Sequence, residues 1–300
     1  LELALLYCTN ETMLADAQEA LQKFQVSQTP FLKELLAAAH SIVENTPDKA
    51  GLPGEIIALQ KEARNLKAGD LELTGYLYPQ ARFVMGGTVD LAYPAVNEAG
   101  VEVTTPAFVL ASHEVSQYQW ALFIQENPMW EKANLAALQA QGLVDEAYLA
   151  GLSPSTVFIT NRPIHNISYY AAQAFCDWLS KKTGKTVFIP SESMWTAAAL
   201  SHSNLAFAAS LSPIPTQLEE PVSLLGGVWE LTSTTHIPLA RITDYQKAHA
   251  LHQRFGLPIQ PIVKGGSYLN DAKTISSNTV GVVDPDACGD FIGFRVAWYE

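Results

Sequence analysis

Short apolar runs alternate with turns rich in glycine, proline and asparagine from Tyr76 onward. Each run is too short for an ordinary helix and is bounded by residues that form turns, so we expect strands. These strands are expected at residues 83–87, 108–110, 187–189, 227–231, 262–267 and 292–298. The pattern predicts a domain of short strands and long loops, with only a few helices between them.

Helices in this part of the chain are marked by residues that cap helix ends. Ser116, Ser168 and Ser191 each precede a helical apolar pattern and offer a hydroxyl to its first turn. Gly184 follows one of these patterns and Gly142 follows another, as glycine often does at helix C-termini. The predicted helices cover residues 116–123, 131–141 and 169–183, and a segment that begins after Ser191 and carries Trp195.

Residues 1–72 differ from the rest because their apolar residues recur with the helical period. Three helices are expected there, at residues 11–24, 30–43 and 53–66. Alone, such a helical region would bury little apolar surface, so we expect it to pack on its neighbours. The sequence therefore divides into a helical region at residues 1–72 and a larger domain at residues 76–300.

Composition and charge restrict the partner and the compartment. Hydrophobic residues make up 48% and charged residues 16%, which is typical of a packed globular protein. The net charge of −12 lacks the basic footprint of a nucleic-acid-binding protein. No apolar run reaches the roughly 20 residues that a transmembrane helix needs, so no such segment is expected. The apolar residues before Cys8 fit either the end of an export signal or a buried helical turn, and a cell-envelope or extracellular location is favoured.

The three cysteines are widely separated and form no Cys-x-x-Cys motif, so they predict neither a zinc site nor a redox pair. Cys176 lies among apolar residues of a predicted helix and is expected to be buried. Cys288 follows Asp286 in a polar loop and is expected to be the exposed thiol.

Eight short motifs follow one another in a fixed order between residues 76 and 299. They are 83–87 (FVMGG), 113–118 (HEVSQY), 162–169 (RPIHNISY), 171–179 (AAQAFCDWL), 189–195 (IPSESMW), 226–232 (GGVWELT), 264–268 (KGGSY) and 293–295 (GFR). Each motif alone is weak, but the whole series resembles the sulfatase-modifying factor family, the formylglycine-generating enzymes. The resemblance covers roughly three quarters of the chain.

This resemblance implies an α+β domain, a variant of the C-type lectin fold with a few helices around antiparallel strands. It also implies structural roles for four residues of the motifs. Gly265 and Gly266 would allow the backbone to approach its neighbours closely beside a strand. Trp229 would anchor the core, and Arg295 would be held by hydrogen bonds inside the fold.

The chemistry of the family is missing from the gap between motifs 264–268 and 293–295. Formylglycine-generating enzymes carry two reactive cysteines just after Gly-Gly-Ser, which bind copper and activate oxygen. The resemblance places Asn270 and Ile275 at these two positions, and neither an amide nor an alkyl side chain supplies a thiolate. We therefore predict no catalytic residues and a non-catalytic protein.

Calcium is the one cofactor for which the resemblance leaves a candidate ligand, Glu230. Family members bind calcium through the asparagine and glutamate of a G-N-V-W-E motif, and here the asparagine is Gly227. Calcium takes about six to eight oxygen ligands, of which one side chain is retained. The sequence thus predicts no cofactor, with calcium at Glu230 as the alternative.

A divergent metal-dependent oxidoreductase of the same superfamily, using copper or non-heme iron, is the alternative function. Related sulfoxide synthases bind iron through histidines, some of them in an added helical domain. Here His40 stands alone on a predicted helix, and His249 and His252 lie in a polar linker. A solvated surface explains these histidines better than a metal site.

The segment 270–290 is rich in asparagine, aspartate, serine and threonine, which adaptable recognition surfaces use. The resemblance places it near the ligand groove and predicts a protein or glycan ligand. Some lectin-fold proteins of this type are diversified by retroelements just before a Gly-Phe-Arg ending, and the composition is compatible with that. An ordinary surface loop would have the same composition, so both interpretations stay open. The predicted ligand-binding residues are Ser267, Tyr268, Asn270, Asp271, Thr274, Ser276 and Asn278.

Overall fold

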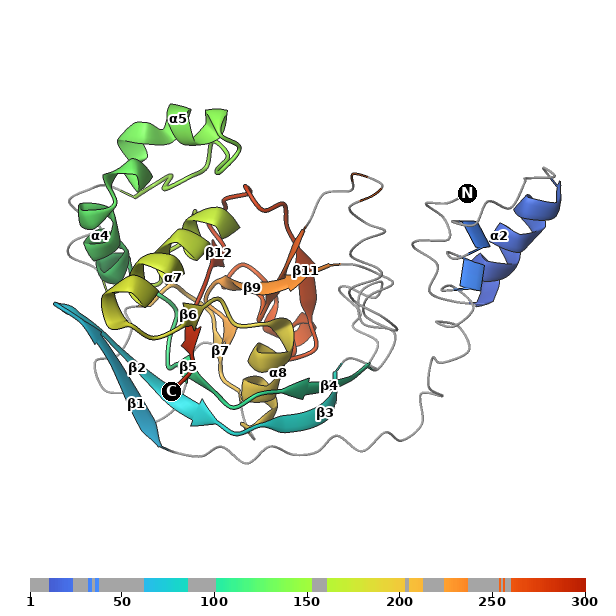
Figure 1. The fold of residues 1–300 in the computed structure, drawn as a ribbon, viewed down its shortest axis with the longest axis horizontal. Helices are drawn as coiled ribbons and strands as arrows, with labels where there is room; N and C mark the ends of the chain where they lie inside the picture. Colours follow the sequence, from blue (N-terminus) through green and yellow to red (C-terminus); the bar gives the residue numbers. More distant parts are fainter. Residues whose placement is uncertain are drawn as a thin grey trace.

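The fold is an α+β arrangement of two main sheets and several helices, shown in Figure 1. It is seen in a computed structural model. The structure describes residues 11–23, 32–33, 36–37, 62–85, 101–152, 161–202, 205–212, 224–236, 254, 256 and 260–300. No helix among these residues is both long and apolar enough to span a membrane.

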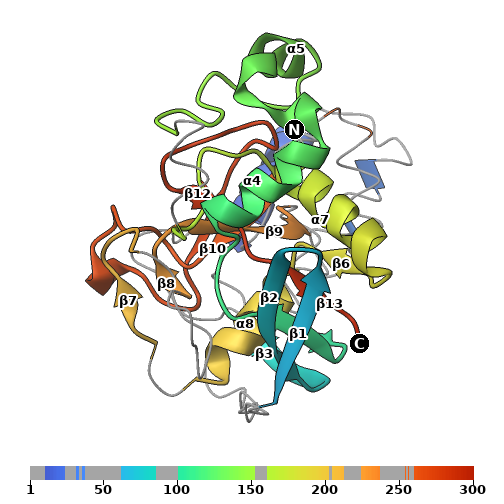
Figure 2. The same cartoon turned by 90° about the vertical axis from the view of Figure 1, so that its left-hand side faces the viewer.

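The larger sheet has five strands in the order β1-β2-β5-β13-β6, and all of its pairs are antiparallel. Figure 2 shows the β1–β2 hairpin in front, and β5 separates it from β13 in the sheet. The predicted strands at residues 108–110 and 187–189 are found in this sheet. Its strands are β1 (Ala63–Ala68), β2 (Leu71–Tyr78), β5 (Phe108–Ala111), β6 (Val187–Phe188) and β13 (Ala297–Trp298).

The predicted helix at residues 53–66 is wrong over its last residues, which form β1. Ala68 pairs with Leu71 across a two-residue turn that begins at Gly69. Gly69 has a φ of 62°, and glycine at the first position of such a turn suits a hairpin. Residues 53–61 lie outside the described part of the chain. The division of the chain near residue 72 stays a prediction, but the sheet already begins at Ala63.

The smaller main sheet has four strands in the order β11-β10-β9-β12, with β12 parallel to β9 and the other pairs antiparallel. The predicted strand at residues 292–298 is split, because β12 belongs to this sheet and β13 to the larger one. Arg295 lies between them and joins the two sheets. The strands are β9 (Trp229–Thr235), β10 (Pro261–Lys264), β11 (Val280–Val282) and β12 (Ile292–Gly293).

Two short strand pairs complete the described β-structure. β3 and β4 pair antiparallel, whereas β7 and β8 pair parallel. The predicted strand at residues 83–87 lies in β3, and its residues 86 and 87 are outside the described part. These strands are β3 (Ala81–Met85), β4 (Val101–Thr105), β7 (Phe207–Ala208) and β8 (Leu225–Gly226).

The helices begin where the capping residues predict. Ser116 forms a capping box with Gln119, and the hydroxyls of Ser168 and Ser191 accept from backbone N–H groups in the first turns of their helices. Gly184 ends α7 in the left-handed conformation. Of the predicted N-terminal helices, the first is α2, and residues 32–33 and 36–37 of the second are helical. The α-helices are α2 (Glu11–Lys23), α4 (Gln117–Glu126), α5 (Leu135–Ala140), α7 (Tyr169–Thr183) and α8 (Glu192–Leu200).

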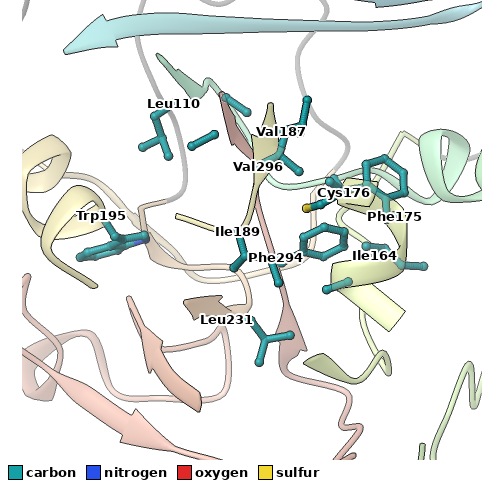
Figure 3. Close-up of a cluster of buried hydrophobic side chains, with 14 of the residues drawn as sticks. Leu110, Ile164, Phe175, Cys176, Val187, Ile189, Trp195, Leu231, Phe294 and Val296 are labelled. Atoms are coloured by element: carbon teal, nitrogen blue, oxygen red, sulfur yellow. The ribbon is translucent and has the colours of Figure 1, made fainter. Parts of the chain in front are cut away.

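The core lies where α4 and α7 pack against the segment between β12 and β13. Phe175 of α7 contacts the rings of Trp120, Phe123 and Phe294 at centroid distances of 5.5–5.9 Å. Figure 3 shows Phe294 beside Phe175, with Ile164 and Leu231 in the same cluster. Helix and strand residues thus surround the Gly-Phe-Arg motif, which fixes the end of the polar segment 270–290.

Candidate functional site

The two glycine motifs lie side by side because β9 pairs with a strand from each. Glu230 of β9 faces Lys264 of β10 on one side and Gly293 of β12 on the other. Residues 265–267 continue from β10, and residues 293–295 continue from β12. We call residues 265–267 and 293–295 the frame, and residues 268–291, which end where β12 begins, the frame loop.

Glu230 and Arg295 form a fully buried ion pair at the base of the frame. Arg295 donates from Nε and Nη2 to the two carboxylate oxygens of Glu230, each at 2.6 Å. Arg295 Nη1 donates to the carbonyl oxygen of Ala111 at 3.1 Å, and Trp195 Nε1 donates to Glu230 Oε2 at 2.9 Å. Burial opposes the charge of Arg295, but attraction to Glu230 outweighs it and raises the pKa of Arg295. The expected internal role of Arg295 is therefore confirmed.

The surroundings of Glu230 do not fit calcium. Both of its carboxylate oxygens already accept hydrogen bonds from Arg295, and one also accepts from Trp195. A calcium ion here would have to displace a guanidinium group or lie beside its positive charge. Within the described ranges, no group of three or more histidine, cysteine, aspartate or glutamate side chains could hold a metal ion.

Gly265 and Gly266 of the frame are both required by their surroundings. Gly265 has a φ of 86°, and a Cβ there would lie 2.4 Å from the carbonyl oxygen of Leu224. Gly266 has a φ of 72°, and its Cβ would lie 2.8–2.9 Å from three carbon atoms of Ile275. The predicted close approach is confirmed at both positions. It also shows that the buried Ile275 side chain fills the space above Gly266.

Asn270 supports the start of the frame loop from within. Its Oδ1 accepts from the backbone N–H of Ser267 at 2.8 Å and from the Ser267 hydroxyl at 3.1 Å. Ser267 is itself buried, and its hydroxyl also accepts from the backbone of Leu269. The pair thus forms a closed turn that holds the loop to the frame.

The other predicted ligand-binding residues lie along the frame loop at varied exposure. Asp271 is exposed and caps a short 3-10 helix, η5 (Ala272–Thr274), by accepting from the N–H of Lys273 at 3.0 Å. Thr274 is exposed, and its hydroxyl donates to the Asp271 carbonyl. Ser276 is exposed, whereas Tyr268 and Asn278 are half-buried.

Sequence reasoning missed two apolar residues of the frame loop, Leu269 and Phe291, which are 61% and 39% exposed. Leu269 follows Tyr268 and Phe291 precedes Ile292, so nothing in the sequence clearly signals that these two side chains are exposed. Exposed apolar side chains that flank polar ones suit a surface that binds a partner. Leu269 and Phe291 are therefore added to the candidate binding residues of the frame loop.

The second half of the frame loop is fastened to two other loops. The N–H of Asp145 donates to the carbonyl of Asp286, and the N–H of Cys288 donates to Asp145 Oδ2, both at 2.9 Å. The N–H of Asn166 donates to Gly289 at 2.9 Å, and that of Tyr169 to Pro285 at 3.0 Å. The loop is therefore held at both of its ends.

Cys288 is buried by this fastening, so the prediction of an exposed thiol there is wrong. Burial raises the pKa of the Cys288 thiol well above its ordinary value. Cys176 is buried as predicted. Cys8, His40, His249 and His252 lie outside the described residues.

Comparison with known proteins supports the resemblance over part of the chain, which contains the first five motifs. Residues 72–214 match the family model of the sulfatase-modifying factor enzyme 1-like domain. This stretch, a little under half of the chain, is therefore similar to a sulfatase-modifying factor domain. An uncharacterized protein of Borreliella burgdorferi is 33% identical over 90 residues, which are 29% of this chain and 18% of that protein. The matched stretch is therefore less than a fifth of the relative's length.

Several solved structures align with most of the chain at low sequence identity. Treponema denticola variable protein 1 aligns with 79% of this chain and 99% of its own, at 14% identity and a TM-score of 0.50. PvdO from Pseudomonas aeruginosa aligns with 84% of this chain and 100% of its own, at 17% identity and a TM-score of 0.44. The predicted α+β, C-type lectin-like fold of the formylglycine-generating enzyme type is thus confirmed.

The motif resemblance places Asn270 and Ile275 where formylglycine-generating enzymes have copper ligands, beyond the stretch that the family model matches. Asn270 offers a neutral amide that is already bonded to Ser267, and Ile275 offers a packed alkyl group. Soft copper requires thiolate or imidazole ligands, so these residues do not fit it. The frame is retained, and its interior is filled by non-ligating side chains.

Proposed function

We propose that the sulfatase-modifying factor-like domain is a non-catalytic binding module whose frame loop contacts a protein or glycan ligand. One observation carries the proposal. Asn270 closes a turn and Ile275 fills the space over Gly266, and the motif resemblance assigns these two positions to the family's reactive cysteines. Both replacements stabilise the frame loop, which is what a rigid binding surface needs and what an oxygen-activating site does not.

The chemistry of the loop favours recognition of a polar ligand with an apolar part. Asp271, Thr274 and Ser276 are exposed hydrogen-bonding groups, and Leu269 and Phe291 add apolar area. Because both ends of the loop are fastened, little conformational entropy is lost when a ligand binds. Exposed side chains of the loop, such as Asp271 and Thr274, can also change without disturbing the core, whereas the buried Ile275 and Cys288 are part of it.

The same arrangement supports a link to diversified proteins. One solved structure with this fold is titled a variable protein, and the frame loop lies just before Gly-Phe-Arg here. We propose that variation between relatives concentrates in residues 268–291. Sequencing this locus in related strains, together with a search for a neighbouring template repeat, tests that part. Uniform variation along the whole domain would refute it.

Binding is tested on a glycan array and a displayed-peptide library. The double variant Asn270→Ala/Asp271→Ala is expected to weaken binding at least about tenfold. It removes the exposed carboxylate of Asp271 and the hydrogen bonds by which Asn270 holds the start of the frame loop. The control Asp70→Ala changes an exposed aspartate in the β1–β2 turn and is expected to bind normally. Trp229→Ala removes a buried ring and is expected to lower the free energy of unfolding by about 3–5 kcal/mol.

Two results would overturn the proposal. Ligands selected by the wild-type protein that bind the Asn270→Ala/Asp271→Ala variant equally well would place the site elsewhere. Stoichiometric copper or iron in the purified full-length protein, with oxygen uptake, would favour the oxidoreductase of the same superfamily instead.

A further inference from the structure

Five charged side chains are fully buried around the frame, and only four of them form pairs. Arg295 and Glu230 form the bidentate ion pair described above, and Lys264 Nζ lies 4.0 Å from Glu192 Oε1. Trp195 joins the pairs, because its Nε1 donates to Glu230 and its ring lies 5.3 Å from Lys264 Nζ. The fifth charged residue is Glu114, which is 0% exposed.

Glu114 has no hydrogen-bond partner for either carboxyl oxygen among the described residues. It lies between β5 and α4, where the next residue, Val115, donates its N–H to the carbonyl of Phe294 at 2.9 Å. An ionised carboxylate that is buried without hydrogen bonds is costly, whereas its protonated form is much less so. Its surroundings therefore favour the neutral acid.

The charged groups that face Glu114 support the same conclusion. Arg295 attracts its negative charge and Glu230 repels it, and these two belong to one neutral pair. The neighbouring His113 donates from Nδ1 to the Glu114 carbonyl at 2.6 Å. Burial lowers the pKa of His113 to about 4, so this histidine is neutral at pH 7. Among the described residues, the buried cluster is electrically balanced only when Glu114 carries a proton.

We propose that Glu114 holds a proton in the folded domain at neutral pH, and that release of this proton to solvent is an alkaline switch that loosens the frame. An ionised Glu114 competes with Glu230 for Arg295, whose side chain also holds the Ala111 carbonyl of β5. Weakening these bonds separates β5 and the start of α4 from the segment 294–296. The switch goes beyond ligand binding and does not depend on it.

The sign of the pH dependence follows from the proton held by the folded state. Burial raises the pKa of Glu114 to about 8; the charge of Arg295 lowers it, that of Glu230 raises it, and, as the smallest effect, an interaction with the residue's own backbone N–H lowers it. In the unfolded chain the same group titrates near 4.5. The contribution of the Glu114 proton to the stability of the folded state is thus complete below pH 4.5, and it is lost as the pH rises toward 8. Across that window the folding equilibrium constant falls by about tenfold per pH unit because of this one group.

Replacing Glu114 with glutamine isolates this effect, since Glu114→Gln keeps the shape and cannot ionise. Urea unfolding of the full chain, followed by tryptophan fluorescence, is measured from pH 5 to 9. The ratio of the variant's folding constant to the wild type's is expected to rise by about tenfold per pH unit and to level off above pH 8. The control Glu131→Gln changes an exposed glutamate and should give a constant ratio. A constant ratio for Glu114→Gln as well would overturn the proposal.

Two measurements test the proposal independently of the variant's folding and at the frame itself. The carbon NMR signal of the Glu114 carboxyl group in the wild-type protein should keep its protonated position at pH 6.5 and move near pH 8. A signal already at the carboxylate position at pH 6.5 would refute the bound proton. Above pH 8, amide hydrogen exchange at Val115 should accelerate beyond its intrinsic pH dependence in the wild type only. Equal acceleration in Glu114→Gln would refute the switch.

Discussion

Gly266 and Ile275 provide the sharpest test of how the frame is built. A Cβ at position 266 would lie 2.8 Å from Ile275 Cγ1 and 2.9 Å from both Cδ1 and Cγ2. Because Cγ1 and Cγ2 both branch from the same Cβ, no single rotation moves both away. The variant Gly266→Ala thus overpacks this contact, which costs about 1–3 kcal/mol. The positive φ of 72° costs about 1–2 kcal/mol more.

The variant Gly184→Ala separates these two contributions. Gly184 has a φ of 69°, but a Cβ there meets no atom within 4 Å. It is therefore expected to lower the free energy of unfolding by only about 1–2 kcal/mol, the cost of the left-handed conformation. Gly266→Ala should lower it by about 2–5 kcal/mol in the same urea titration.

A double-variant cycle then assigns the extra cost to Ile275. Ile275→Ala alone should cost about 2–5 kcal/mol, because the side chain is buried. The double variant Gly266→Ala/Ile275→Ala should lose about 1–3 kcal/mol less than the sum of the two single-variant losses. The reason is that the new methyl group enters the space that isoleucine leaves. For the double variant Gly184→Ala/Ile275→Ala, the loss should equal the sum of the two single-variant losses to within about 0.5 kcal/mol. Additive losses in the Gly266 cycle would refute the packing argument.

Two further predictions concern the buried groups. Arg295→Met should lower the free energy of unfolding in urea titrations by about 3–5 kcal/mol, because it leaves the Glu230 carboxylate buried without a partner. The double variant Arg295→Met/Glu230→Leu should restore part of this loss. If it restores none, the pairing is contradicted. In a Cys8→Ser background, Cys176 and Cys288 should react with a thiol reagent only after unfolding, because both are buried; rapid labelling of one thiol in the native protein would show that the fastening at Asp145 opens.

Local signals in the sequence predict most of the helices correctly. Helix starts depend on the capping residue and the turn that follows it, as at Ser116, Ser168 and Ser191, and Gly184 ends the turn before it. A few neighbouring residues in the sequence therefore determine where these helices begin and end. The helix expected over residues 63–66 is wrong because the partner strand β2 determines this segment. Apolar spacing alone does not distinguish a strand from a helix end over so few residues.

The candidate site is less accessible to such reasoning, because its decisive contacts are distant in sequence. Arg295 was expected to be bonded internally, but its partners lie 65 and 184 residues away. Nothing near Glu114 signals that its carboxyl group is buried without a partner. Cys288 is surrounded by polar residues in the sequence, and only the contact with Asp145 buries it. Pairing across such separations is decided by the whole fold.

The split between β12 and β13 has a consequence for how the domain is made. Only three residues separate these two strands. β12 lies directly beside β9 in the smaller sheet, and β13 lies directly beside β5 in the larger one. The chain leaves the ribosome with its amino end first. Neither sheet can therefore reach its final strand order until residues 292–298 have emerged, and the nascent domain must wait with two unfinished sheet edges. Chaperones that shield strand edges during synthesis would act on this domain at that stage.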